Sequence, residues 1–105
     1  MPAGRRSQID RWYQLTREIL PAMAAHHRWP IRLDHCFMRV CLDAAVGTPW
    51  SDMIGRPAVR TMSDAQLAAA IAVGERIVHE PDCLPVLNAA SLQGRRRARL
   101  SLTAA

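Results

Sequence analysis

The sequence has 105 residues, of which 50% are hydrophobic and 22% are charged. This length suits one domain, and this balance excludes an intrinsically disordered chain. No apolar run approaches the ~20 residues that cross a bilayer, and the first residues lack the apolar core of a secretory signal. We therefore expect a cytoplasmic protein without a membrane partner.

The charge is concentrated near the two ends of the chain. All 14 basic residues are arginines, and the formal net charge is +5. Six of the arginines lie near the ends, namely Arg5, Arg6, Arg95, Arg96, Arg97 and Arg99. The remaining arginines roughly balance the nine acidic residues. We therefore expect a basic N-terminal tail (1–6), a helical domain (7–94) and an arginine-rich, mobile C-terminal tail (95–105).

The first predicted helix runs from about Gln8 to His27. Its apolar residues recur at intervals of three and four, and Ser7 is a suitable N-cap. Pro21 lies inside this pattern and lacks a backbone donor, so it should kink or divide the helix.

A second, central helix is predicted from about Arg32 to Val46. It is apolar on most of its surface, and Gly47 followed by Pro49 provides its C-terminal stop. The next segment, Thr48 to Met62, is irregular but carries apolar residues, so we expect a loop that packs over the domain.

The third predicted helix spans Ser63 to His79, with Ser63 and Gln66 in capping-box spacing. Its small residues would allow a neighbouring helix to approach closely. A fourth helix should begin near Pro81 and end near Gly94. The predicted fold is therefore all-α: a single small domain of about four helices, with a long packed loop between helices two and three.

The narrow polar strip of the central helix is the candidate ligand or partner site. Arg32, His35 and Arg39 recur at helical spacing, and guanidinium groups suit phosphate or carboxylate recognition. Tryptophans lie near both ends of this helix and could serve as walls of a pocket or as core anchors. The candidate site comprises Arg32, Asp34, His35, Arg39, Trp29 and Trp50.

The cysteines and histidines predict no metal site. Asp34, His35 and Cys36 point in three directions on a helix, whereas a zinc site needs about four converging ligands. Three cysteines without CxxC spacing indicate free thiols in a reducing compartment. No set of residues that would define a catalytic mechanism is identified.

The C-terminal arginines Arg95, Arg96, Arg97 and Arg99 could contact a polyanion. Such contacts release counterions and give affinity without reading sequence. The alternative is a solvated terminus, so nucleic acid is retained only as a weakly bound partner.

The run Trp29-Pro-Ile-Arg-Leu-Asp-His-Cys-Phe-Met-Arg39, continued by Trp50 and Arg56-Pro57, resembles a group of short proteobacterial proteins labelled as GNAT-related N-acetyltransferases. The resemblance covers about Trp12 to Ser91. It implies acetyl-CoA as a cofactor, whereas the residues themselves indicate none. The sequence lacks the Gln/Arg-x-x-Gly-x-Gly/Ala loop and the alternating strands of that fold.

Two hypotheses for the function follow. The first is a helical interaction module with a protein partner or a second copy, with a weak polyanion contact through its C-terminal arginines. The alternative is a small enzyme, or a subunit that binds an anion or an acyl-CoA, using the polar strip of the central helix.

Overall fold

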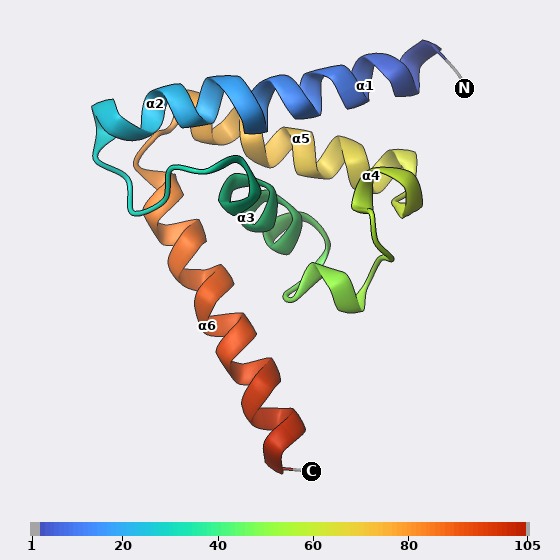
Figure 1. Cartoon of the computed structure of the whole chain (residues 1–105), viewed down its shortest axis with the longest axis vertical. Helices are drawn as coiled ribbons and strands as arrows, with labels where there is room; N and C mark the ends of the chain where they lie inside the picture. Colours follow the sequence, from blue (N-terminus) through green and yellow to red (C-terminus); the bar gives the residue numbers. More distant parts are fainter. Residues whose placement is uncertain (1–2, 105) are drawn as a thin grey trace.

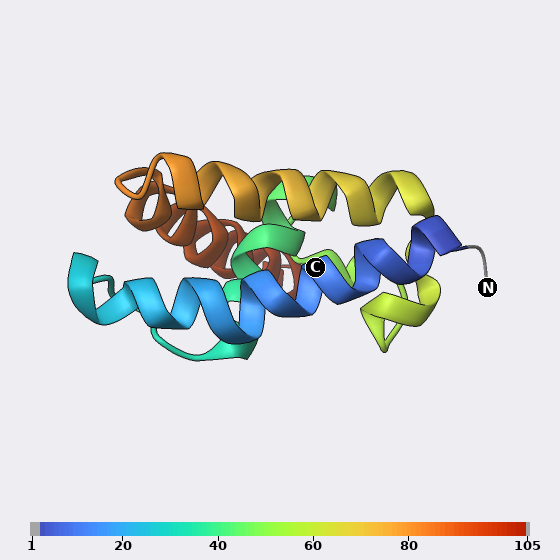
Figure 2. The same ribbon diagram turned by 90° about the horizontal axis from the view of Figure 1, so that it is seen from above.

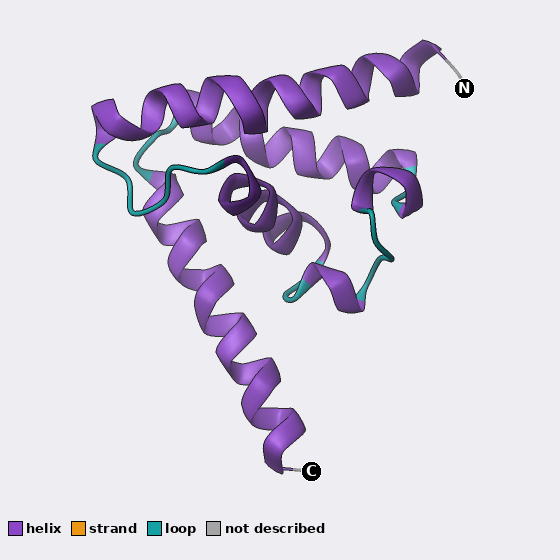
Figure 3. Ribbon diagram, viewed as in Figure 1, coloured by secondary structure: helices purple, strands orange, loops and turns teal. Residues whose placement is uncertain are grey.

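Residues 3–104 of the chain are described by a computed structural model, with side chains for residues 4–101. The first helical rod contains α1 (Ala3–Tyr13), the π-helical turn η1 (Gln14–Ile19) and α2 (Leu20–His27). The remaining elements are α3 (Asp34–Val46), the 3-10 turn η2 (Trp50–Asp52), α4 (Ala58–Thr61), α5 (Asp64–His79) and α6 (Cys83–Ala104). Only short loops connect these elements, and residues 3–104 contain no strand (Figure 3).

The rod α1–η1–α2 and α5 lie side by side and run in the same direction (Figures 1 and 2). Helix α3 packs against both of them, while α6 runs away from this pair toward the C-terminus (Figure 1). The predicted all-α class is confirmed for the described residues. The mixed sheet of an acetyltransferase of the GNAT type is therefore absent from residues 3–104.

The core lies around α3, which agrees with its predicted central position. Phe37, Val40 and Cys41 are fully buried there. Gly74 of α5 lies so close to the rod that an added Cβ would come within 3.1 Å of a methyl group of Leu15. The prediction of a close approach to the third helix is thus confirmed, because any side chain at this position would force Leu15 to shift.

Pro21 lies at the start of α2, and the rod is divided into α1 and α2 by η1 just before it, in agreement with the predicted division. The six-residue π-helical turn ends two residues before the proline, and Thr16 donates its hydroxyl to the carbonyl of Trp12. A π turn widens the backbone hydrogen-bond spacing, so the chain can pass the missing N–H of the proline and continue as α2.

Two helix boundaries agree with the sequence signals. Helix α3 ends at Gly47, whose φ of 127° is a conformation that glycine readily adopts. Helix α5 begins with a complete capping box, in which Ser63 and Gln66 each accept a hydrogen bond from the other's backbone N–H.

Helices extend into both predicted tails, so the predicted start of the first helix near Gln8 and the predicted end of the fourth near Gly94 are wrong. Helix α1 already begins at Ala3, while residues 1 and 2 lie outside the described part. Helix α6 passes through Gly94 and continues to Ala104. Gly94 is required by packing: an added Cβ would come within 2.7 Å of the Cγ2 atom of Thr48. The glycine that the sequence analysis interpreted as a helix end is instead required by a close contact with Thr48, from a distant segment.

The segment between α3 and α5 packs on the domain as predicted, although η2 and α4 make it less irregular than expected. Ile54 and Met62 are buried. The N-terminal arginine Arg5 fixes the far end of this segment, since it donates hydrogen bonds to the carbonyls of Val59 and Met62.

Candidate functional site

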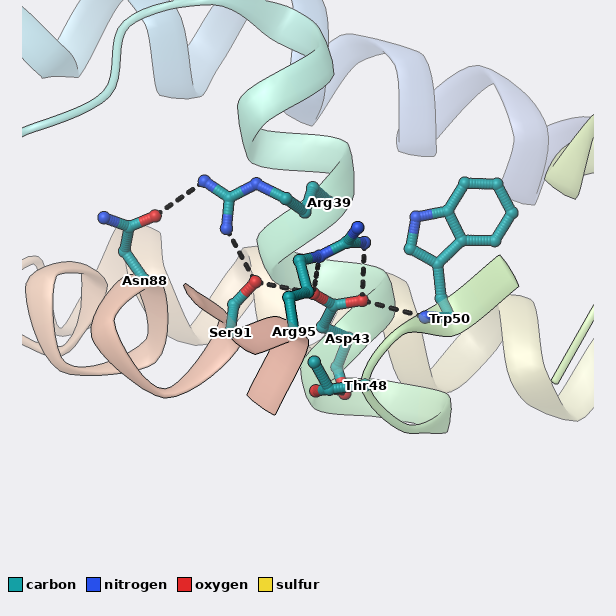
Figure 4. A network of polar contacts seen from close by, with 7 residues as sticks. All are labelled: Arg39, Asp43, Thr48, Trp50, Asn88, Ser91 and Arg95. Carbon is teal, nitrogen blue, oxygen red and sulfur yellow. Dashed lines mark hydrogen bonds and ion pairs between the residues drawn. The ribbon is translucent and has the colours of Figure 1, made fainter. Parts of the chain in front are cut away.

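A buried carboxylate joins three segments next to the site (Figure 4). The Asp43 side chain, on α3, is only 1% exposed. Arg95 of α6 donates two hydrogen bonds to it, over 2.8 and 3.0 Å, and Ser91 donates a third. The backbone N–H of Trp50 donates the fourth over 2.9 Å. Four donors use the acceptor capacity of both carboxylate oxygens, so Asp43 locks η2 and α6 onto α3.

Arg39 extends this network toward the N-terminal part of α6. Its guanidinium donates hydrogen bonds to Ser91 Oγ over 2.6 Å and to Asn88 Oδ1 over 2.7 Å. Figure 4 shows the guanidinium directed at these two residues and away from Trp50. The charged group of Arg39 is therefore used to bind α6.

Next to the network, a cleft of about 520 Å³ opens between the rod, α3 and the segment that follows η2. This volume lies within the range of about 300–1,000 Å³ that is usual for small-molecule sites. Aromatic and aliphatic side chains form most of the lining. The lining residues are Trp12, Tyr13, Arg17, His35, Met38, Arg39, Leu42, Trp50, Arg56, Pro57, Ala58 and Val59.

The cleft has positively charged residues and no described acidic residue in its lining. The guanidinium carbon of Arg17 lies 3.8 Å from the centre of the Tyr13 ring. On the segment after η2, the guanidinium carbon of Arg56 lies 5.3 Å from the ring centre of Trp50. Neither guanidinium has a hydrogen bond or ion pair with another residue of the described chain. A stacked guanidinium keeps its in-plane N–H donors available for an oxyanion.

Three of the six predicted site residues line this cleft, namely His35, Arg39 and Trp50. The other three, Trp29, Arg32 and Asp34, do not line it. Trp29 is a core anchor, with its indole N–H donating to the carbonyl of Pro81 and its ring against Phe37. Asp34 accepts the backbone N–H of His35 at the start of α3, and Arg32 is exposed.

The sequence analysis missed Arg17 and Arg56, the two arginines with available donors. A signal existed for Arg17, since Tyr13 and Arg17 are four residues apart on one helix and their side chains meet at that spacing. For Arg56 the signals were its place in the resemblance and in a segment already expected to cover the domain.

The four C-terminal arginines have different environments. Arg95 is held by Asp43, and its side chain is 28% exposed. Arg96, Arg97 and Arg99 are exposed on α6. The predicted cluster of four is therefore reduced by one member, which belongs to the internal network.

A metal site and a reactive cysteine are the two roles that the thiols and the other possible metal ligands could have. Within residues 3–104 no three His, Cys, Asp or Glu side chains are grouped so that they could hold a metal ion. Burial, with a smaller contribution from Cys83, raises the pKa of the Cys41 thiol to about 12. Cys41 is therefore protonated and unreactive at neutral pH.

The chain matched no protein-family model, no curated protein and no solved structure. Among the described helices, none combines the length and the apolar character that crossing a membrane requires.

Proposed function

We propose that the protein binds a small organic anion in the cleft, with an apolar body against the aromatic wall and an oxyanion group on Arg17 and Arg56. The supporting observation is the pair of guanidinium groups that lie over the Tyr13 and Trp50 rings and lack an acidic partner in the described chain, beside an apolar lining. Carboxylates and phosphates both accept two parallel hydrogen bonds from a guanidinium.

His35 is the third polar group of this proposed site. Its side chain is 72% exposed, and its Nδ1 atom lies 3.6 Å from Asp34 Oδ1, beyond hydrogen-bond distance. The imidazole therefore has no hydrogen bond to another described residue that a ligand would have to replace. Arg39 has a supporting role, because its guanidinium holds α6 while its side chain forms part of the lining.

The ligand class is tested by calorimetry on the full chain with matched compounds. The panel contains an aromatic and an aliphatic carboxylate, the corresponding phosphate monoesters, the uncharged alcohols, and CoA with acetyl-CoA. We expect heat of binding with the anions and none with the alcohols. We also expect weaker binding at high salt, because exposed charges are screened.

Variants locate the binding. Arg17→Met and Arg56→Met should each weaken binding about tenfold or more, since a charged hydrogen bond contributes about 1.5–3 kcal/mol. Arg60→Met is the control, because Arg60 is an exposed arginine of α4 outside the lining. Absence of heat with every anion at millimolar concentration contradicts the proposal. Binding that survives in both cleft variants contradicts the assigned residues.

A further inference from the structure

Helix α6 has one face that binds the domain. Leu84, Asn88, Ser91 and Arg95 recur at intervals of four, three and four residues, which places them on one side of a helix. Leu84, Asn88 and Ser91 are buried, and Arg95 is bound to Asp43. This face accounts for the attachment of α6 to α3.

The remaining surface of α6 exposes apolar side chains. Val86 is 68% exposed, Leu92 51% and Leu100 61%. In the described part of the chain the only other large apolar side chains with such exposure are Leu33 and Met53, on other segments. Val86 and Leu100 are 14 residues apart, close to four full turns, so they lie on nearly the same side of α6.

Helix α6 gives this surface a positive charge, while Asp52 of η2 lies across a hollow that Leu92 also lines. Helix α6 has no acidic residue from Cys83 to Ala104. Arg96 lies four residues from both Leu92 and Leu100, so it sits one turn from each. Arg96 and Arg97 are exposed and have no hydrogen bond or ion pair with a described residue.

The end of α6 faces the η2 segment, where Ala98 and Arg99 share a hollow with Pro49, Ser51 and Asp52. Beyond Arg95 it runs away from α1, α2 and α5 (Figure 1). A helix as short as this end is marginal in water on its own, since helices gain most of their stability from packing an apolar face. A partner that covers Leu92 and Leu100 would supply that packing.

We propose that the outer surface of α6, defined by Val86, Leu92, Arg96, Arg97 and Leu100, docks an acidic amphipathic segment of a partner protein. Such a segment places carboxylates on the arginines and covers the exposed leucines with its own apolar face. A nucleic acid would leave the leucines in water, and α6 offers no aromatic ring for a base to stack on.

A second copy of this chain fits the surface less well. Four of its acidic side chains, on Asp43, Asp64, Glu75 and Glu80, are already paired with arginines of the same chain. Two α6 helices packed together would also place like charges side by side.

The test measures fluorescence anisotropy of a labelled synthetic helical peptide with leucines along one face and glutamates elsewhere, titrated with the full chain. A peptide of the same composition in scrambled order is the peptide control. We expect the amphipathic peptide to bind at least about tenfold more tightly, because only its order places leucines and carboxylates on matching faces.

The variants Leu100→Asp and Arg96→Glu should each weaken binding of this peptide about tenfold or more. Leu33→Asp and Arg28→Glu make the same chemical changes at exposed positions away from α6, and should leave binding unchanged. Thermal unfolding of each variant verifies that the fold is retained. Arg17→Met should also bind the peptide normally, which separates this surface from the cleft.

Three results would overturn the proposal. The first is equal binding of the ordered and scrambled peptides. The second is tighter binding of a short single-stranded oligonucleotide that is sensitive to Arg96→Glu but insensitive to Leu100→Asp, which would identify a polyanion surface. The third is a dimer in light scattering that Leu100→Asp dissociates, which would identify a second copy as the occupant.

Discussion

At the scale of single residues, Asp43 is a buried carboxylate whose ion pair with Arg95 holds α6 on α3. Replacing it by asparagine keeps the shape but leaves the partly buried Arg95 guanidinium without a negative partner. Breaking one side of a buried ion pair costs about 3–5 kcal/mol. We expect Asp43→Asn to lower the free energy of unfolding in urea by about this amount.

The control for this prediction is Asp52→Asn, an exposed carboxylate on neighbouring η2. It should change the free energy of unfolding by less than about 0.5 kcal/mol. Equal stability of the two variants would show that the Asp43 network contributes little to folding.

Two glycines in helices should respond to alanine with opposite signs. Alanine is favoured over glycine inside a helix by about 1 kcal/mol. At Gly4 a Cβ meets nothing within 4 Å, so Gly4→Ala should leave the protein as stable or make it more stable. At Gly94 the Cβ would collide with the short side chain of Thr48, so Gly94→Ala should lower the melting temperature. A rise in both variants would contradict the close contact.

The buried thiol predicts a loss of stability in alkali. Burial raises the pKa of Cys41 to about 12, above its value in the unfolded chain. The unfolded state therefore loses the proton first, and the stability contribution is complete below about pH 9 and is lost between there and about pH 12.

Between pH 8 and pH 10, Cys41→Ala should accordingly lose less unfolding free energy than the unmodified protein, by roughly 1 kcal/mol. Urea unfolding at the two pH values measures this difference. Parallel losses in the two proteins would indicate that the thiol ionises with equal ease in both states.

At the scale of elements, Arg5 fixes the end of the segment that forms one wall of the cleft. Besides its two hydrogen bonds to backbone carbonyls it pairs with Asp64, and its side chain is 14% exposed. Arg5→Met removes all these contacts and should destabilise the protein by about 1–3 kcal/mol.

The adjacent Arg6 is exposed, and Arg6→Met is therefore the matched control. Hydrogen exchange should show faster opening of residues 58–62 in the Arg5 variant and no change in the Arg6 variant. Identical exchange in both variants would exclude the role assigned to Arg5.

The element scale also shows which signals in the sequence were reliable. Local signals succeeded: the capping box of Ser63 and the stop at Gly47 depend on residues a few positions apart. Signals that depend on distant contacts failed. Gly94 looked like a helix end because nothing in the sequence places Thr48 beside it.

At the scale of the whole molecule, the candidate site was only partly predictable for the same reason. The spacing of His35 and Arg39 placed both on one strip of α3, and both line the cleft. The role of Arg39 could not be foreseen, because its partners lie about 50 positions away on α6. Arg17 and Arg56 come from separate segments, and only the tertiary fold brings them to one cleft.

The two attachments of the segment between α3 and α5 have a consequence for how this protein could diversify. The segment is fastened at one end by Asp43 and at the other by Arg5, and it anchors itself through Ile54 and Met62. Between these anchors, Arg56, Pro57, Ala58 and Val59 line one wall of the cleft. Evolution or protein engineering can therefore replace a residue such as Arg56 and change which ligand the cleft binds, while the surrounding helices keep their packing.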